Sequence, residues 1–123
     1  MIAVKNLNGE ILYKLDIDTL AGADLRRFNF RKANLRGQNF SGTNLERANF
    51  SDADASDANF SNAVLNNASF KNANIQNADM READIERANF ENANISGVKI
   101  NSKTRTFKIR ADGAKGEFNV IYP

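Results

Sequence analysis

Bulky apolar residues recur at every fifth position through most of this chain, and this period constrains its fold more than any other feature. Their positions are Leu20, Leu25, Phe30, Leu35, Phe40, Leu45, Phe50, Phe60, Leu65, Phe70, Ile75, Met80, Ile85, Phe90, Ile95 and Ile100, with only Ala55 breaking the series. Positions five apart point to opposite faces of a strand and step about 140° around an α-helix, so neither element buries them all. The backbone must therefore turn a corner in every repeat and wind into a coil.

The near alternation of aromatic and aliphatic residues along this series predicts how many repeats make one coil. A period of two repeats requires an even number of repeats per coil, and two repeats would leave no room inside. Four repeats per coil place Phe30, Phe50, Phe70 and Phe90 in a single core column. We therefore predict a solenoid of square cross-section with about four coils, stacked ~4.8 Å apart like the strands of a sheet.

The residues between the apolar centres are also periodic. A small residue, mostly alanine, stands two positions before each centre, and Asn or Asp lies between them in most repeats. Runs such as Ala33-Asn34-Leu35-Arg36-Gly37 and Ala48-Asn49-Phe50-Ser51-Asp52 resemble the pentapeptide-repeat family, and the resemblance covers about residues 20–102. It implies an all-β, right-handed quadrilateral β-helix. It implies little about function, because most members of the family have no assigned activity.

The segments outside the repeats are expected to form β-hairpins, at residues 1–19 and 103–123. In the first, Asn8-Gly9 is typical of a two-residue type I′ turn, which would place Ile2, Val4, Ile11, Tyr13 and Leu15 on one face over the first coil. In the second, residues 104–110 and 118–122 alternate around a glycine-containing turn, which predicts a cap or a dimer contact. Phe28, in place of a small residue, is expected to plug the first end of the tube. All these parts would form one structural domain.

The composition removes several classes of catalytic site. The chain has no cysteine and no histidine, which excludes disulfides, thiolate or imidazole metal ligands and serine–histidine triads. Acidic residues cluster at Asp52, Asp54 and Asp57 and again at Glu82, Asp84 and Glu86, but acids at these repeat positions are expected to face water. We therefore expect a protein that is not an enzyme and holds no cofactor or metal.

Charge is distributed unevenly although the net charge is only +2. Residues 20–47 hold six Lys/Arg against two acids, residues 48–100 hold four against eight, and residues 101–123 hold five against two. Arg27, Arg47 and Arg87 should occupy one corner of successive coils. The candidate partner surface consists of Arg26, Arg27, Arg31, Lys32, Arg36, Arg47 and Arg87. These side chains either pair with neighbouring acids on a solvated wall or form a docking strip for an acidic partner or a phosphate backbone.

Three functions stay open from the sequence. The first is a protein-interaction module or scaffold, which the resemblance favours. The second is a DNA mimic that modulates a DNA topoisomerase, as in the quinolone-resistance members of the family, although those proteins are acidic, long and dimeric. The third is binding of nucleic acid through the first-coil arginines, which the expected lack of outward aromatic residues weakens.

The sequence also leaves the assembly and the location as expectations. Neither a membrane-length apolar run nor a secretory leader is evident, so we expect a cytoplasmic protein without membrane contact. We expect either a monomer or a homodimer formed through a terminal hairpin.

Overall fold

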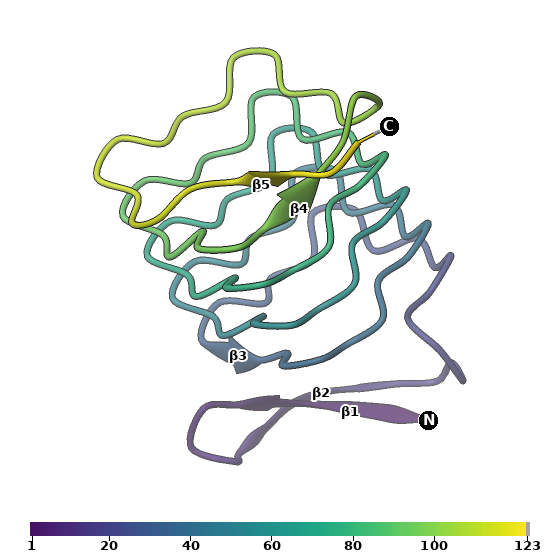
Figure 1. Cartoon of the computed structure of the whole chain (residues 1–123). Coiled ribbons are helices and arrows are strands. Elements are labelled where there is room, and N and C mark those ends of the chain that lie inside the picture. The colour runs from purple at the N-terminus through teal and green to yellow at the C-terminus, as the bar shows by residue number, and fades with distance from the viewer. Residues whose placement is uncertain (123) are drawn as a thin grey trace.

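The computed structural model describes residues 1–122 and shows a chain wound into stacked square coils (Figure 1). Regular strands are few: β1 (Ile2–Asn6), β2 (Ile11–Leu15), β3 (Ala33–Asn34), β4 (Lys99–Ile100) and β5 (Asn119–Val120). Single parallel bridges on all four walls join each coil to the next. On one wall they connect Asp24, Asn44, Val64, Asp84 and Arg105 in turn, so the chain makes five levels where the sequence predicted about four.

In residues 20–98 each corner is a four-residue turn whose third residue has a positive φ. After Phe50, for example, the N–H of Ala53 donates to the Phe50 carbonyl at 3.1 Å, and Asp52 has φ 60°. A four-residue turn closed in this way, with positive φ at its third residue, is of the type II kind. Asparagine tolerates this conformation, and Asn62, Asn67, Asn72 and Asn77 occupy it at four successive corners with φ between 60° and 63°.

The Asn and Asp residues before the apolar centres act locally on the same corners. Asn49 Oδ1 accepts a hydrogen bond from the N–H of Ser51 at 2.9 Å, and Asn59 Oδ1 accepts one from Ser61 at 2.9 Å. This contact satisfies an N–H that the coil-to-coil ladder leaves free. The physical reason for Asn or Asp at this position is therefore a side chain that caps its own turn.

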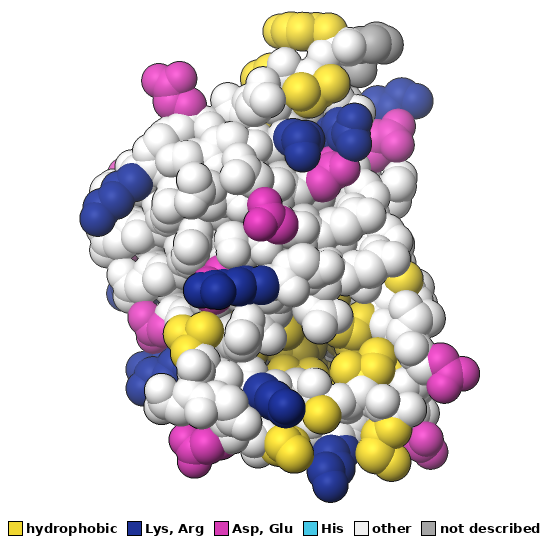
Figure 2. Space-filling model, turned by 60° about the horizontal axis from the view of Figure 1, so that its bottom comes forward, with side chains coloured by type: hydrophobic (Ala, Val, Ile, Leu, Met, Phe, Trp, Pro, Cys, Tyr) yellow, Lys and Arg dark blue, Asp and Glu magenta, His cyan; other side chains and the backbone are white. Residues whose placement is uncertain are grey.

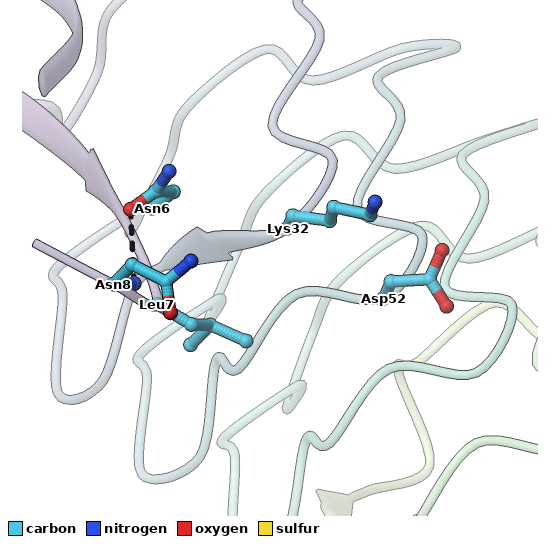
Figure 3. Close-up of a pocket in the computed structure, with 5 residues that line it drawn as sticks. All are labelled: Asn6, Leu7, Asn8, Lys32 and Asp52. Carbon is cyan, nitrogen blue, oxygen red and sulfur yellow. Dashed lines mark hydrogen bonds between the residues drawn. The ribbon is translucent and has the colours of Figure 1, made fainter. Parts of the chain in front are cut away.

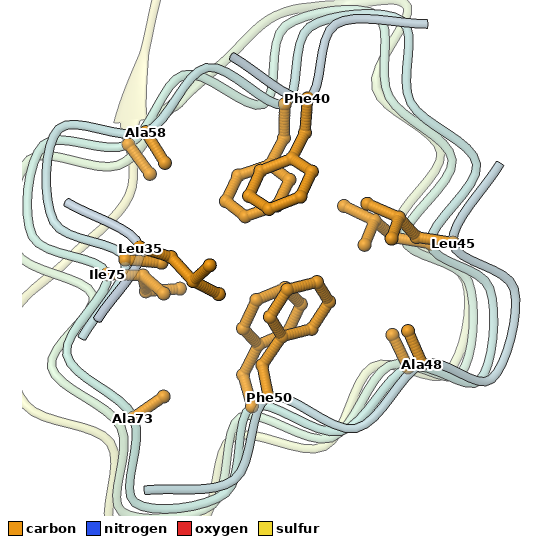
Figure 4. Close-up of a cluster of buried hydrophobic side chains, with 14 of the residues drawn as sticks. Leu35, Phe40, Leu45, Ala48, Phe50, Ala58, Ala73 and Ile75 are labelled. Carbon is orange, nitrogen blue, oxygen red and sulfur yellow. The ribbon is translucent and has the colours of Figure 1, made fainter. Parts of the chain in front are cut away.

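The apolar centres fill the tube in columns (Figure 4). Phe30, Phe50, Phe70 and Phe90 stack with ring centroids 4.7–5.3 Å apart, which is the predicted core column. A second column holds Phe40 and Phe60, and rings of the two columns meet edge to face. Alanines line the walls between the columns, where a larger side chain would collide with these rings.

The N-terminal hairpin is present, but its turn differs from the prediction. β1 and β2 pair antiparallel with Ile2 opposite Leu15, and the register shifts after Val4. Of the two turn residues only Gly9 has a positive φ, whereas a type I′ turn requires positive φ at both. The side chain of Asn6 holds the longer loop instead, by accepting N–H groups of residues 8 and 10. The shift leaves Ile11 51% exposed, so it does not join the face that covers the core.

The hairpin predicted for residues 103–123 is wrong for the part that the structure describes, because residues 103–122 continue the solenoid as a fifth coil, and residue 123 lies outside the described residues. Arg105, Arg110 and Lys115 bridge in parallel to the coil below, and β5 pairs in parallel with β4. Two irregularities make the repeat of the fifth coil hard to recognise in the sequence. One extra residue is accommodated near Asn101, so that the bridge spacing from Asp84 to Arg105 is one residue longer than in the earlier coils.

The second irregularity is an inverted size pattern in the fifth coil. The centre positions are held by small residues such as Ala111, while Ile109 and Phe118 occupy positions that are alanine in the middle coils. Phe118 lies edge-on to Phe90, with centroids 5.9 Å apart. At the other end Phe28, as predicted, lies over Phe30 with centroids 5.1 Å apart. A phenylalanine in a small-residue position therefore packs over the core at each end.

Candidate functional site

The arginine row predicted from the repeat runs along one corner of the solenoid. The N–H of Arg27 donates to the carbonyl of Glu46 and that of Arg47 to the carbonyl of Asn66, which places these residues on successive levels. Arg27, Arg47 and Arg87 all have φ near +60°, the left-handed region that side chains of this size rarely adopt. The row continues to Lys108 in the fifth coil, with φ 56°. Sequence reasoning missed this lysine because the extra residue shifts its position in the repeat.

Four of the seven candidate basic side chains make ion pairs. Their contacts are Arg26 with Asp24 at 2.9 Å, Arg31 with Asp52 at 3.4 Å, Arg36 with Asp54 at 2.6 Å and Arg47 with Glu46 at 3.8 Å. Among residues 1–122, Arg27, Lys32 and Arg87 form no ion pair. Figure 2 shows basic and acidic side chains interspersed at the hairpin end of the molecule. The predicted surface is therefore largely neutralised by the chain itself.

The pair between Arg36 and Asp54 is the most sheltered of these contacts. The side chain of Asp54 is 10% exposed, and burial alone would raise its pKa. Hydrogen bonds from the Arg36 guanidinium and from the N–H and hydroxyl of Ser56 outweigh that effect and hold the pKa of Asp54 below 3.8. This carboxylate stabilises the junction between the first two coils, and no part of its geometry points to catalysis.

Ion pairs between coils explain the uneven charge along the chain. Arg31 and Arg36 in the first coil pair with acids of the second. In the same way, Lys103, Arg105 and Arg110 of the fifth coil pair with Glu82, Glu86 and Glu91 of the fourth. In the part of the chain that the structure describes, ion pairs between coils occur only at these two terminal junctions. The basic end segments and the acidic middle thus attach the outer coils.

Two aromatic side chains, Phe107 and Tyr122, are largely exposed, contrary to the sequence expectation. Phe107 is 58% exposed at the corner of the fifth coil. The guanidinium carbon of Arg87 lies 5.7 Å from its ring centroid and the Lys108 ammonium 5.3 Å. Cations at these distances are attracted by the face of the ring. The corner therefore ends in a small cluster of one aromatic ring and two cations.

The two acidic clusters of the sequence do not form metal centres. Within residues 1–122 there is no group of three or more acidic side chains arranged to hold a metal ion. Several of these acids have cationic partners, including Asp52, Asp54, Glu82 and Glu86. The described chain also contains no helix long and apolar enough to cross a membrane.

An open pocket lies where the hairpin loop meets a corner of the first two coils (Figure 3). Asn6, Leu7 and Asn8 line it from the loop, and Lys32 and Asp52 from the coils. The N–H of Leu7 donates to the carbonyl of Lys32 at 3.1 Å, which fixes the loop to the solenoid. Leu7 itself is 51% exposed, so the pocket is a surface hollow rather than an enclosed cavity.

The stacked square coils, the type II corners and the packed aromatic columns define a β-solenoid whose outward side chains are regularly spaced along each wall. A family model described as "Pentapeptide repeat region" matches residues 19–102. The chain belongs to the pentapeptide repeat family, and its fold is the right-handed quadrilateral β-helix of that family.

Solved structures agree with this assignment. A pentapeptide repeat protein from the thylakoid lumen of Arabidopsis thaliana is 30% identical with a TM-score of 0.76, covering 78% of this chain and 66% of that one. Rfr23, from the cyanobacterium Cyanothece, is 25% identical with a TM-score of 0.53, covering 85% and 88%. QnrB1, a plasmid-mediated fluoroquinolone resistance protein, shares the fold at 21% identity and a TM-score of 0.64, covering 83% of this chain and 50% of that one. A search of curated proteins found no significant match.

Proposed function

We propose that this protein is a non-catalytic interaction module that binds another protein. The observation that carries the proposal is the fixed spacing of outward side chains on a backbone hydrogen-bonded from coil to coil. The contacts Phe30 N to Asn49 O, Phe50 N to Ser69 O and Phe70 N to Asn89 O are all 2.7 Å long. A surface held in this way loses little conformational entropy when a partner docks, which favours binding.

The contacts also weigh against the two alternatives from the sequence. A DNA mimic needs a continuous acidic stripe, but Glu82, Glu86 and Glu91 are paired with cations of the fifth coil. Binding of a phosphate backbone needs free cations, but Arg26, Arg31 and Arg36 are paired with aspartates. The fold shared with QnrB1 does not favour the topoisomerase role by itself, because unrelated functions use one fold.

Site-specific photo-cross-linking in the native host tests the proposal. A photoreactive residue is introduced at exposed Asn67 on the arginine corner or at exposed Lys115 on the fifth coil, and the same variants kept without irradiation are the control. We expect one or a few reproducible protein adducts from an exposed position and none without irradiation. Exposed positions that give only the adducts of the control would contradict the proposal.

Two further measurements address the alternatives and the location. We expect no effect of the purified protein on gyrase supercoiling at stoichiometric excess and no salt-dependent retention on DNA. The cytoplasmic location stays a prediction, to be checked by fractionation of the host, since the Arabidopsis relative comes from the thylakoid lumen.

A further inference from the structure

A surface hollow lies on one corner of the solenoid, where side chains of the first three coils meet. The residues that line it are Arg31, Asn49, Ser51, Asp52, Lys71 and Asn72. The N–H of Lys32 donates to the Ser51 carbonyl and the N–H of Asp52 to the Lys71 carbonyl, both at 3.0 Å, which fixes this corner from coil to coil. Arg31, Ser51 and Lys71 therefore occupy one position of three successive coils, with the serine between the two cations.

The spacing of the two cations suits an anion of phosphate size. Because successive coils are stacked ~4.8 Å apart, the backbones of Arg31 and Lys71 are separated by about 10 Å. A phosphate group that accepts hydrogen bonds of ~2.8 Å on both sides fits between two such long side chains. The short side chain of Ser51 leaves room for it. The two cations can therefore hold one anion from opposite sides.

The polar groups between the cations are arranged as donors. The N–H of Lys71 donates to Ser69 Oγ at 3.4 Å, and Ser69 Oγ lies 3.0 Å from Ser51 Oγ. When Ser69 donates in this contact, the hydroxyl hydrogen of Ser51 stays available for a further acceptor. Asn49 Oδ1 accepts the N–H of Ser51 at 2.9 Å, and its Nδ2 group has no acceptor in the described chain. Both side chains can thus donate to an anion in the hollow.

Cations outnumber acids around the hollow. Arg31 contacts Asp52 through Nε at 3.4 Å, and this exposed pair leaves its two terminal nitrogens without a partner in residues 1–122. Lys71 forms no ion pair in the same part of the chain. Lys32 lines the neighbouring pocket, where its side chain extends towards Asp52 (Figure 3). Asp52 is the only acid lining either pocket in the described structure, so three cations stand against one carboxylate.

The equivalent hollow two corners further along the chain lacks this excess of cations. Ser61 and Arg81 hold there the positions of the serine and the lysine described above. Arg81 donates to the carboxylate of Asp79 through Nε at 3.0 Å and through Nη2 at 2.8 Å. Glu82 adds a second acid to the lining. A repeated corner with a serine therefore does not make an anion site by itself, and the charges of the first hollow set it apart.

We propose that the hollow around Ser51 binds a phosphate group, either free or on a phosphorylated side chain. The terminal nitrogens of Arg31 and the ammonium of Lys71 would neutralise it, and the Ser51 hydroxyl would donate to one of its oxygens. A phosphate carries about −1.5 to −2 charges at pH 7, which matches the cation excess better than a carboxylate does. The site does not depend on the proposed function, because a small anion can bind whether or not a protein partner docks.

The test follows NMR signals of the isotope-labelled full chain near pH 7. The two probes are inorganic phosphate and a short phosphoserine peptide. Sodium chloride at matched ionic strength and the unphosphorylated peptide are the blanks. We expect saturable shifts of the Arg31 Nε–H and of the Ser51 and Lys71 amides with at least one probe. Shifts equal to those of the blanks, or spread evenly over all basic residues, would overturn the inference.

The two probes also separate the possible sources of the phosphate group. Saturation by inorganic phosphate alone would identify a small free phosphate as the ligand. Saturation by the phosphoserine peptide would identify a phosphorylated side chain, since the hollow then accepts a phosphate that is attached to a chain.

Two matched pairs of variants locate the site. Lys71→Gln should weaken phosphate binding about three- to fivefold, the usual effect of losing one exposed charged contact, and Arg81→Gln, which removes an equal charge two corners away, should not. Ser51→Ala should weaken binding, whereas Ser61→Ala should leave it unchanged. Thermal melts establish that all four variants are folded. Equal weakening within either pair would show attraction to the protein as a whole and would refute this site.

Asp52→Asn provides a change of the opposite sign. It removes the acid of the hollow, and asparagine tolerates the φ of 60° that this corner requires. We expect phosphate to bind about two- to fivefold more tightly, a gain that damage to the fold would not produce. Unchanged or weaker binding would contradict an anion site that depends on the excess of cations.

Discussion

Phe50 and Phe70 lie almost parallel in the middle of the solenoid, with ring centroids 4.7 Å apart and 3° between the ring planes. Both side chains are fully buried. Each ring is therefore packed between rings of the coils above and below, and a truncated side chain would leave a void that its neighbours cannot fill without moving the backbone.

Replacing Phe70 by alanine should lower the free energy of unfolding by about 3–5 kcal/mol, the usual cost of removing a buried aromatic ring. Equilibrium denaturation in urea measures this change. The matched control is Lys71→Ala, at the next residue but exposed, which should stay within about 0.5 kcal/mol of the original protein. Similar losses for the two variants would mean that the ring column does not carry the stability of the core.

The Asp54 carboxylate should make the free energy of unfolding depend on pH in the acidic range. Its pKa in the folded protein is below 3.8, so its contribution is complete above the unfolded value and is lost as pH falls through 3.8 and then through the lower folded value. Asp54→Asn keeps an oxygen that accepts the Ser56 N–H but loses the Arg36 pair. We expect this variant to be less stable than the original protein at pH 7.

The difference between the two proteins should shrink as pH falls well below 3.8, and melting temperatures across that range measure it. Arg36→Gln removes the same pair from its other side and should give the same pH signature. Arg26→Gln breaks an exposed pair within one coil and should change stability little. A difference that is constant with pH would show that the ion pair does not stabilise the fold.

The fifth coil should become easier to open at high salt. Three ion pairs attach it to the fourth coil, through Lys103, Arg105 and Arg110, and their side chains are largely exposed. At 1 M salt the screening length falls to about 3 Å, which weakens such pairs. Because each contributes up to ~1 kcal/mol, amide exchange in residues 105–115 should accelerate by a few-fold to about tenfold.

Amides of the middle coils, such as residues 60–79, provide the internal reference for that experiment. No ion pair between coils involves them in the described structure, so their exchange should not accelerate with salt. An equal acceleration in both regions would point to general destabilisation, and the special role of the terminal pairs would then be wrong.

The corner conformation should make Arg47→Asn stabilising by roughly 0.5–1 kcal/mol. Arg47 has φ 60°, and asparagine adopts this region at lower cost than a long side chain. Asn62→Val, which places a β-branched residue at an equivalent corner, should instead destabilise by about 1–3 kcal/mol. Thermal or urea melts of both variants measure the effects. The two changes in unfolding free energy should have opposite signs, because asparagine adopts a positive φ more easily than arginine and valine adopts it less easily than asparagine.

The sequence by itself determined the square coil, the inside of the tube and the corners. A period of five with alternating ring and aliphatic centres admits one arrangement in which Phe30, Phe50 and Phe70 share a column, because each buried position faces an equivalent position one coil away. The turn asparagines and the corner row of Arg27, Arg47 and Arg87 follow from the same count. These features depend on contacts between neighbouring repeats, and a periodic sequence records such contacts directly.

Only the tertiary structure decided that the residues after the repeats form a fifth coil, and which ion pairs the charged side chains make. In the fifth coil, centre positions are held by small residues such as Ala111, and Ile109 and Phe118 take the place of alanines, so this coil leaves no periodic signal in the sequence. One additional residue near Asn101 then moved Phe107 and Lys108 onto the arginine corner. Whether Arg36 faces a partner or Asp54 depends on the distance between two coils, which no local pattern encodes. Two residues of the basic surface expected from the sequence, Arg31 and Arg36, proved to attach the first coil to the second.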